Sequence, residues 1–428
     1  MIHTQKTRKQ MAEDGLITEE TALAAAQEGL EPEAVRAALA EGTLVIPGNS
    51  RRKLAQPRAV GLGASVKVNA NIGASPYRSS LDEELAKLDA AVAAGADSVM
   101  DLSLGPDQIR IRRAVLERSP VMVGTVPLYQ TAFELSASRR DMAEMTADDF
   151  LATVRRQAEE GVDFMTIHSG VTRSSVAAMN AQGRVLGVVS RGGSFLVDWM
   201  RKNDRESPLY EQFDDILDIL AEYDVTLSLG DGMRPGAGAD AGDCAQTAEL
   251  LTLAELTRRA WAKGVQVIIE GPGHVTLDKI AEQMRLQKSL CGGAPFYILG
   301  PLVTDVAAGY DHIAGAIGGA FAAMHGADFL CYVTPAEHLR LPTAEDVREG
   351  TVASKIAAHA GDLARGRKSS MARDRAMSVA RKNLDWEAQI GLCIDPAKAR
   401  AYREQSEIGT DDVCTMCGEF CAIKRLNQ

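Results

Sequence analysis

The sequence predicts an α/β protein: a closed (β/α)8 barrel of the TIM type, with a small helical domain before it and a helical, cysteine-bearing region after it. Between about residues 65 and 334, short β-rich runs alternate with amphipathic segments of helical period. Such alternation implies parallel strands joined by helical crossovers, and eight of these units close a barrel. Nine candidate runs are present, so one should be extra, and an open doubly wound sheet is the alternative.

Residues 1–60 are predicted to form the small N-terminal domain. Residues 1–47 are rich in Ala and Glu and have a helical pattern, a short strand is expected at 43–47, and 48–60 have the polar, basic character of a loop. No apolar stretch follows the charged first residues, so no secretory signal is expected.

Residues 61–340 are predicted to be the catalytic barrel. The candidate strands are 65–73, 97–103, 121–129, 163–170, 185–193, 225–232, 265–273, 296–302 and 328–335. Ser80, followed three residues later by Glu83, predicts a capping box at the start of a crossover helix. Residues 341–395 should form C-terminal helices, and 396–428 form a polar tail that carries three closely spaced cysteines.

Composition limits the classes of function. The chain of 428 residues has 47 Lys and Arg against 58 Asp and Glu, a net charge of −11, which does not favour binding to nucleic acid. No apolar run approaches the ~20 residues of a membrane span, so we expect a cytoplasmic protein without membrane contact. The seven cysteines are odd in number and unevenly placed, which argues against a disulfide framework.

Polar or glycine-flanked residues end nearly every β-rich run. Catalytic groups of a barrel come from the carboxyl ends of its strands. Helix capping alone would favour Ser, Thr, Asp and Asn, whereas several of these endings are Tyr, Arg, Glu or His. We therefore expect an active site ringed by Asn69, Asn71, Asp101, Ser103, Tyr129, His168, Ser190–Gly193, Asp231, Glu270 and His274.

Two of these endings point to particular ligands. Ser190-Arg191-Gly192-Gly193 suits an anion, because glycines let a phosphate approach the backbone N–H groups and Arg can bind it bidentately. A loop that needs glycine for its backbone conformation would have the same sequence.

His274 and His338 come from separate loops and could hold a divalent metal, although a lone histidine is more often a core or capping residue.

The strongest local signal is Cys414-x2-Cys417-x3-Cys421 in the tail. Three adjacent thiols without a disulfide context indicate a soft metal. A four-iron cluster with three cysteine ligands leaves one iron open, and that iron can chelate S-adenosylmethionine and start radical chemistry. A zinc knuckle completed by a distant histidine and a redox dithiol are the alternatives.

The chain resembles the thiamine pyrimidine synthase family, radical enzymes that make hydroxymethylpyrimidine phosphate. The matching stretches follow the family's order over about residues 43–423: VNANIG, VMDLS, GTVPLYQ, VDFMTIH, VVSRGGS, SLGDGMRPG, EGPGH, APFYILGPLVTD, GYDHI, LCYVTPAEHLRLP, KIAAHAGDLARG and CTMCGEFC. The resemblance implies the barrel, a homodimer, and a mobile tail that brings the cluster to the partner's active site.

The same resemblance assigns residues. The implied substrate is aminoimidazole ribotide, contacted by Asn71, Met100, Tyr129, His168, Ser190, Arg191, Gly192, Asp231, Arg234, Glu270 and Tyr297. Asp231, Glu270 and His168 are the expected catalytic groups. His274 and His338 correspond to the ligands of zinc or another divalent metal, and Cys414, Cys417 and Cys421 to those of the [4Fe-4S] cluster. An electron donor such as ferredoxin or flavodoxin is also expected.

The sequence departs from the family pattern near the site. Ala308, Leu104 and Thr276 replace usual Pro, Thr and Pro residues, and the loop 237–246 lacks the usual Asn or Thr before its Asp. These changes favour a paralogue with the same substrate, 5-hydroxybenzimidazole synthase of anaerobic cobalamin lower-ligand synthesis, with the thiamine pyrimidine as the alternative product. A zinc-dependent barrel hydrolase with structural cysteines and a metal-binding or redox-sensing protein are the alternatives from other classes.

Overall fold

The computed structural model describes residues 6–78, 80–405 and 413–426. The chain divides into two compact units, Met1–Gly361 and Asp362–Gln428. The four-part division predicted from the sequence stays a prediction. Within the described residues, no helix is both long and apolar enough to cross a membrane.

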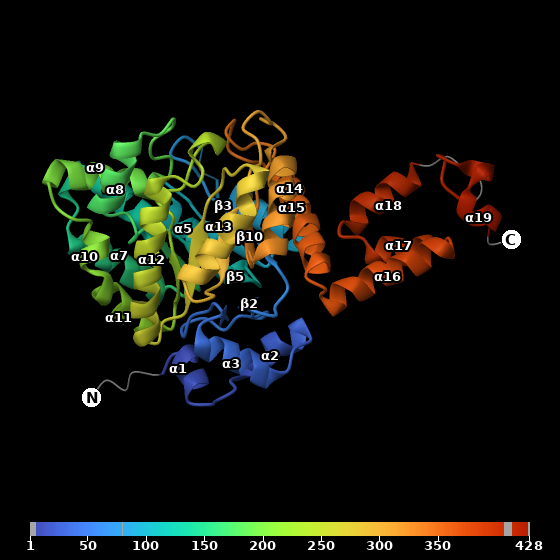
Figure 1. Cartoon of the computed structure of the whole chain (residues 1–428), viewed down its shortest axis with the longest axis horizontal. Helices are drawn as coiled ribbons and strands as arrows, with labels where there is room; N and C mark the ends of the chain where they lie inside the picture. Colours follow the sequence, from blue (N-terminus) through green and yellow to red (C-terminus); the bar gives the residue numbers. More distant parts are fainter. Residues whose placement is uncertain (1–5, 79, 406–412, 427–428) are drawn as a thin grey trace. The chain divides into compact units, whose positions relative to one another are not determined.

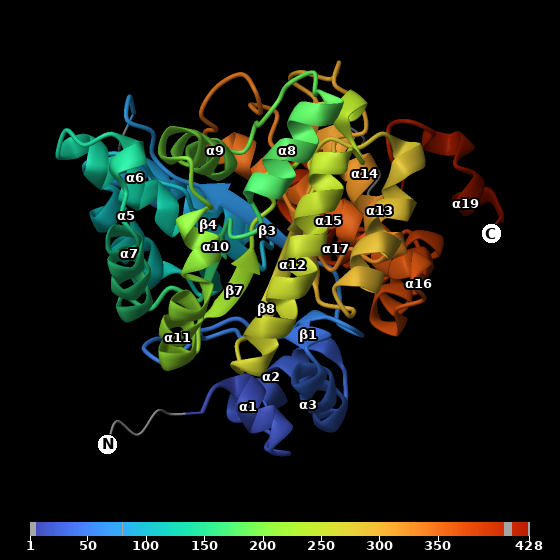
Figure 2. The same cartoon turned by 60° about the vertical axis from the view of Figure 1, so that its left-hand side comes forward.

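Eight parallel strands close the barrel of the first unit, in the order β10-β3-β4-β5-β6-β7-β8-β9. Figure 2 shows four of them, β3, β4, β7 and β8, among the surrounding helices. The strands are β3 (Lys67–Ile72), β4 (Ser98–Asp101), β5 (Met122–Thr125), β6 (Phe164–Ile167), β7 (Thr226–Leu229), β8 (Val267–Gly271), β9 (Phe296–Leu299) and β10 (Phe329–Cys331). The predicted closed barrel is confirmed, and the open sheet is excluded because β10 pairs with both β9 and β3.

Helices surround this barrel (Figure 1). They are α4 (Leu81–Ala93), α5 (Gln108–Arg118), α6 (Pro127–Ala137), α7 (Ala147–Glu159), α8 (Arg173–Gln182), α9 (Arg191–Asn203), α10 (Pro208–Glu211), α11 (Phe213–Tyr223), α12 (Cys244–Ala262), α13 (Leu277–Leu290), α14 (Asp311–His325) and α15 (Ala344–Ala364), with short 3-10 turns at Met142–Glu144 and Gly238–Asp240. Ser80 caps α4, since its hydroxyl accepts the Glu83 N–H at 3.3 Å. This is one half of the predicted capping box, and the Glu83 carboxylate accepts from Arg78 instead.

The prediction of a strand at 185–193 is wrong. Residues 184–190 form a loop, and α9 begins at Arg191. The backbone N–H groups of Val185 and Leu186 donate to the Asp240 carboxylate at 2.8 and 3.1 Å, so they are not available to a sheet. Gly187 has a positive φ of 61°, which breaks an extended run. This run was the extra one of the nine.

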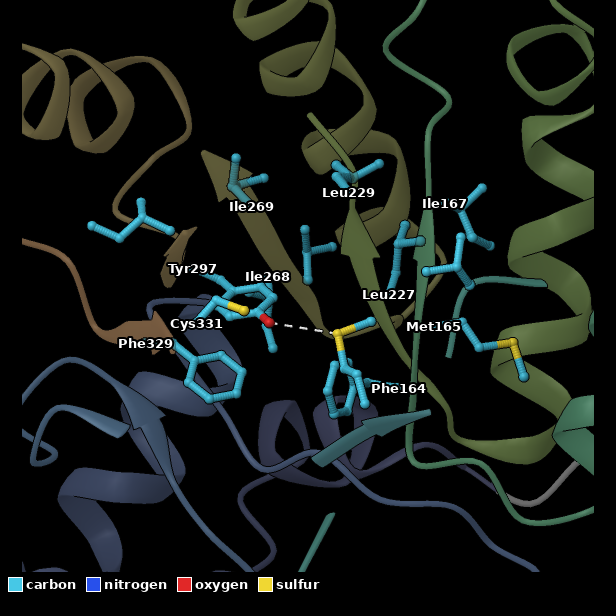
Figure 3. Packing of buried hydrophobic residues seen from close by; sticks show 14 of the residues in the cluster. Phe164, Met165, Ile167, Leu227, Leu229, Ile268, Ile269, Tyr297, Phe329 and Cys331 are labelled. Atoms are coloured by element: carbon cyan, nitrogen blue, oxygen red, sulfur yellow. Dashed lines mark hydrogen bonds between the residues drawn. The ribbon is translucent and has the colours of Figure 1, made fainter. Parts of the chain in front are cut away.

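Interdigitating side chains fill the barrel interior (Figure 3). The rings of Tyr297 and Phe329 stack with centroids 4.4 Å apart, and Phe164 meets Phe329 edge to face. A methyl group on Gly124 would lie 2.2 Å from the Phe164 ring, so glycine makes room for that ring. A barrel filled in this way is a packed core and confines ligands to its ends.

The N-terminal segment covers the amino end of the barrel. It consists of α1 (Arg8–Glu13), α2 (Glu19–Glu28), α3 (Pro32–Glu41) and an antiparallel pair, β1 (Leu44–Val45) with β2 (Val60–Gly61). Lys67, at the first position of β3, pairs with Glu28 at 2.8 Å, and the side chain of Gln266, just before β8, accepts the Ile46 N–H at 2.7 Å. The carboxyl ends of the strands are therefore the end left for a site.

The second unit is helical. It contains α16 (Lys368–Lys382), α17 (Trp386–Leu392), α18 (Pro396–Glu404), a 3-10 turn at Gly418–Phe420 and α19 (Ala422–Leu426). The Arg403 guanidinium lies 4.1 Å from the centre of the Trp386 ring, which ties α18 to α17. The three cysteines of the tail lie around the 3-10 turn.

Candidate active site

A cavity opens at the carboxyl ends of the barrel strands. Its lining includes most of the residues assigned to the substrate from the sequence: Asn71, Met100, Tyr129, His168, Asp231, Arg234, Glu270 and Tyr297. They come from β3, β4, β8 and β9 and from the segments after β5, β6 and β7. Residues up to 226 positions apart in the sequence thus meet at one site, as expected for a barrel enzyme.

A hydrogen-bonded network forms one wall of the cavity. Asn69 Nδ2 donates to the Tyr297 hydroxyl at 2.7 Å and to Asn71 Oδ1 at 2.8 Å. The Tyr297 hydroxyl donates to Met100 Sδ at 3.5 Å (dashed line in Figure 3). Asn71 Nδ2 donates to Cys331 Sγ at 3.1 Å. Cys331 lines the cavity but was not among the predicted site residues, although it too ends a barrel strand.

Glu270 is held by two hydroxyl groups. Thr166 Oγ1 donates to Glu270 Oε1 at 2.6 Å, and Ser228 Oγ donates to the same oxygen at 3.2 Å. Burial raises the pKa of Glu270 above its ordinary value even though these donors oppose the shift. Thr166 and Ser228 were missed because they lie inside β6 and β7, and their inward direction follows from strand register that the sequence alone does not give.

Asp231 and Arg234 face each other on the segment after β7. Arg234 Nη1 lies 3.2 Å from Asp231 Oδ1. Burial raises the pKa of Asp231 to about 8; Arg234 opposes the rise, and the nearby Glu270 adds to it. At neutral pH Asp231 therefore holds a proton in a substantial fraction of molecules, so it can donate as well as accept a hydrogen bond.

His168 is a neutral imidazole at this site. It is 2% exposed, and burial lowers its pKa to about 3, with the Arg234 guanidinium contributing. Its Nδ1 is buried without a protein hydrogen-bond partner. A neutral ring beside a cavity can donate from one nitrogen and accept at the other, which suits a role in orienting a polar ligand.

Ser190, Arg191 and Gly192, the other residues assigned to the substrate, do not line this cavity, but they start α9 beside two residues that do, His168 and Tyr129. Ser190 caps the helix, and its hydroxyl accepts the Gly193 N–H at 3.2 Å. A methyl group on Gly192 would lie 2.5 Å from the His168 ring, so the glycine lets the helix end approach that ring closely. The Arg191 guanidinium lies 4.8 Å from the centre of the Tyr129 ring. Free N–H groups of a first helical turn beside an Arg form an anion-binding arrangement.

His274 and His338 lie together near the barrel mouth. Their ring centroids are 5.3 Å apart. His274 Nδ1 lies 2.8 Å from Asp305 Oδ1, and His338 Nδ1 lies 3.2 Å from Asp311 Oδ2. A carboxylate that holds one ring nitrogen directs the other toward a metal, so the pair fits a divalent cation such as zinc. His338 also has a positive φ of 61°, a strained backbone that is typical of functional sites.

Cys414, Cys417 and Cys421 belong to the second unit, around a turn closed by a Gly418 N–H to Cys414 carbonyl bond of 3.0 Å. Backbone N–H groups of Cys417 and Met416 lower the pKa of the Cys414 thiol, which favours the thiolate needed to bind iron. Among the residues that the structure describes, no three His, Cys, Asp or Glu side chains converge as a ligand set. The thiol chemistry thus fits a cluster, while its assembled geometry stays a prediction.

The fold and this cavity define a barrel enzyme whose polar groups converge on one cavity at the carboxyl ends of the strands. The chain belongs to the radical SAM ThiC family, whose family model matches residues 7–428. It is therefore a radical S-adenosylmethionine enzyme, and the [4Fe-4S] cluster and S-adenosylmethionine expected from the sequence are supported by the family.

Curated relatives cover almost the whole chain. A phosphomethylpyrimidine synthase of Desulfotalea psychrophila is 53% identical over 96% of this chain and 95% of its own length. Those of Geobacter metallireducens and Desulforudis audaxviator are 54% and 56% identical, and the alignments cover 99% and 97% of this chain and 97% and 96% of the relatives. These names support the product given as the alternative in the sequence analysis, and not the hydroxybenzimidazole that it favoured. Nothing in them supports a zinc hydrolase.

Proposed function

We propose that this chain is a phosphomethylpyrimidine synthase, which rearranges aminoimidazole ribotide to hydroxymethylpyrimidine phosphate for thiamine biosynthesis. The observation that carries the proposal is the identity of 53–56% to enzymes of that name over nearly the full chain. The departures at Leu104, Thr276 and Ala308 leave the cavity lining unchanged, since none of the three lines it. They therefore carry less weight than the overall identity.

The proposed roles follow from the geometry of the cavity. The first turn of α9, with Ser190, Arg191 and Gly192, binds the phosphate, because its N–H groups and a guanidinium lie beside two residues of the cavity lining. Asn71, Met100, Tyr129 and Tyr297 form the walls that orient the ribotide.

The groups at the base of the cavity handle protons. Asp231 alternates between carboxyl and carboxylate near neutral pH and is the best placed to donate and recover a proton. Glu270, held by Thr166 and Ser228, has a fixed oxygen for a ribose hydroxyl. Neutral His168 donates a hydrogen bond to the substrate. Arg234 lies beside Asp231 and offsets the negative charge of Asp231 and Glu270.

Two cofactors complete the proposal. Cys414, Cys417 and Cys421 would hold the [4Fe-4S] cluster, which when bound supplies the electron that cleaves S-adenosylmethionine. His274 and His338 would hold zinc or another divalent metal, oriented by Asp305 and Asp311. A ferredoxin or flavodoxin as electron donor and a homodimeric state are part of the same proposal.

Genetic complementation tests this function. A bacterial strain that lacks its own pyrimidine synthase, and needs the pyrimidine of thiamine to grow, should grow without it when it expresses this chain. The Cys417→Ser variant should not restore growth, whereas Cys244→Ser should, because Cys244 is exposed and lies outside the tail cluster. Failure of the wild-type chain to restore growth, despite full expression and a loaded cluster, would overturn the proposal.

A further inference from the structure

A second cavity of about 240 Å³ lies beside the substrate cavity, along α12 and α13. Asp231, Glu270 and Gly271 line both cavities, so these residues form the wall between them. Lys279, Glu282 and Leu286 of α13 line the second cavity as well, and Glu282 and Leu286 are solvent-exposed. The second cavity therefore extends from the shared wall of the active site to exposed residues of α13, away from the barrel mouth.

Glu249 of α12 lines this side cavity and has no role in the proposed mechanism so far. It is 2% exposed. Its Oε2 accepts the Met233 N–H at 2.8 Å, which fixes the segment that carries Asp231 and Arg234. Its Oε1 is buried without a protein partner. The backbone N–H groups of Met233 and Gly232 thus hold the carboxyl group, and Oε1 has no hydrogen-bond partner among the residues that the structure describes.

The side cavity contains other polar atoms of the same kind. Asp231 Oδ2 and Gln283 Nε2 are also buried without a protein partner, and both residues line it together with Glu249. A buried polar atom of this kind is usually hydrogen-bonded to ordered water. Three such atoms along one cavity are positions at which ordered water would bind between the barrel surface and Asp231.

The burial of Glu249 favours its neutral form, although the Met233 and Gly232 N–H groups and the Arg234 guanidinium oppose the shift. Burial raises the pKa of Glu249 well above its ordinary value, and the charge of Asp231 adds to the increase. The titratable groups that face it are Asp231 and Arg234 on the segment after β7, Glu270 at the end of β8, and Lys279 and Glu282 on α13. Burial thus favours the protonated form of Glu249, which lies beside a second acid, Asp231, whose pKa is also raised.

We propose that the side cavity is a proton-exchange route and that Glu249 is its relay residue, which returns protons from solvent to Asp231 while substrate fills the barrel mouth. In this step the Oε1–H bond of Glu249 breaks and its proton passes through water to the Asp231 carboxylate. A proton from bulk solvent, handed along the water of the side cavity, then re-forms the Oε1–H bond, so that one solvent proton ends on Asp231 and no hydroxide is left in the cavity. This proposal depends on the proposed function at one point: Asp231 is taken as the group that exchanges protons with the substrate.

Infrared difference spectroscopy of the full-length, cluster-free protein at pH 7 gives a test that does not depend on turnover. Subtracting the spectrum of Glu249→Gln from that of the wild type should show the carbonyl stretch of one protonated carboxyl group. The absence of that band would overturn the relay role of Glu249, whatever the activity of the enzyme. Because the spectrum needs no turnover, this result can be told apart from a failure of the proposed synthase function.

Turnover of the reconstituted enzyme gives the second test. Glu249→Gln keeps an oxygen for the Met233 N–H, so ribotide affinity should stay within about twofold, while turnover should fall by about 100-fold, the usual size of a lost acid–base group. Glu249→Ala should be equally slow and should be partly rescued by acetate, which fits the side cavity; acetate should not accelerate the wild type. Turnover of Glu249→Gln at the wild-type rate would show that Glu249 is only structural. The same conclusion would follow if both variants lost ribotide binding equally and acetate did not restore the turnover of Glu249→Ala.

A matched pair of substitutions tests the route itself. Leu250→Trp should fill part of the side cavity and slow turnover, because Leu250 lines it. Leu251→Trp should leave turnover unchanged, because Leu251 is the next residue of α12, is 54% exposed and does not line this cavity. Equal rates for the two variants would contradict a route through this cavity.

Discussion

Replacing Gly192 by Ala should weaken ribotide binding more than it weakens the fold. The added methyl carbon would lie 2.5 Å from the Cε1 and Nδ1 atoms of His168, whereas carbon atoms in contact lie about 3.5–4.0 Å apart. The His168 ring or the first turn of α9 must therefore move by ~1 Å. Overpacking of this kind costs about 1–3 kcal/mol of stability.

The effect on the substrate should be larger than on the fold. The displaced elements are the proposed phosphate site and the neutral imidazole beside it, and a ~1 Å misplacement at a reacting site costs about 100-fold in rate. Isothermal titration with aminoimidazole ribotide and anaerobic turnover would measure the loss, and thermal unfolding would measure stability. Gly391→Ala is the control, because a methyl group there meets nothing within 4 Å. Unchanged affinity and turnover in Gly192→Ala would refute the placement of the substrate beside His168.

Three further predictions concern pH and metals. Burial raises the pKa of Asp231 to about 8, so the folded chain keeps the Asp231 proton over a pH range in which the unfolded chain has released it. The contribution of Asp231 to the free energy of unfolding is therefore fully present below about pH 4 and is lost as the pH rises through about 8. Asp231→Asn should therefore gain stability relative to wild type between pH 5 and 8 in urea unfolding, and parallel pH profiles would contradict this. His274→Ala should lose most of its bound zinc and Asp305→Asn part of it by elemental analysis, whereas equal zinc in His274→Ala and the control His325→Ala would exclude the histidine site. Cys421→Ser should lose the cluster's visible absorption and most of its iron, and full retention of both would remove this cysteine from the ligand set.

The barrel could be predicted because its signal is local and repeated. Eight runs of apolar residues separated by amphipathic segments appear at the strand positions that the structure gives. The strand predicted at 185–193 does not form, for a reason outside its own sequence. The Asp240 carboxylate, more than 50 residues further along the chain, accepts the backbone N–H groups of Val185 and Leu186. β-propensity describes a segment by itself, and tertiary contacts override it.

The site was predictable to the extent that its residues end strands or match motifs. Tyr129, His168, Asp231 and Glu270 fall in this group, and they line one cavity. Thr166 and Ser228 lie inside strands, and their inward orientation depends on barrel register. Glu249 lies in the middle of α12, where a glutamate usually faces solvent, so nothing in its own segment marks it as buried.

The conversion of aminoimidazole ribotide to a pyrimidine is the proposed reaction of this chain. Its sharpest test is mass spectrometry of an anaerobic reaction containing the reconstituted wild-type protein, dithionite, S-adenosylmethionine and aminoimidazole ribotide. We expect hydroxymethylpyrimidine phosphate together with 5′-deoxyadenosine. A hydroxybenzimidazole in place of the pyrimidine, or no 5′-deoxyadenosine from a protein with an intact cluster, would contradict the proposed reaction.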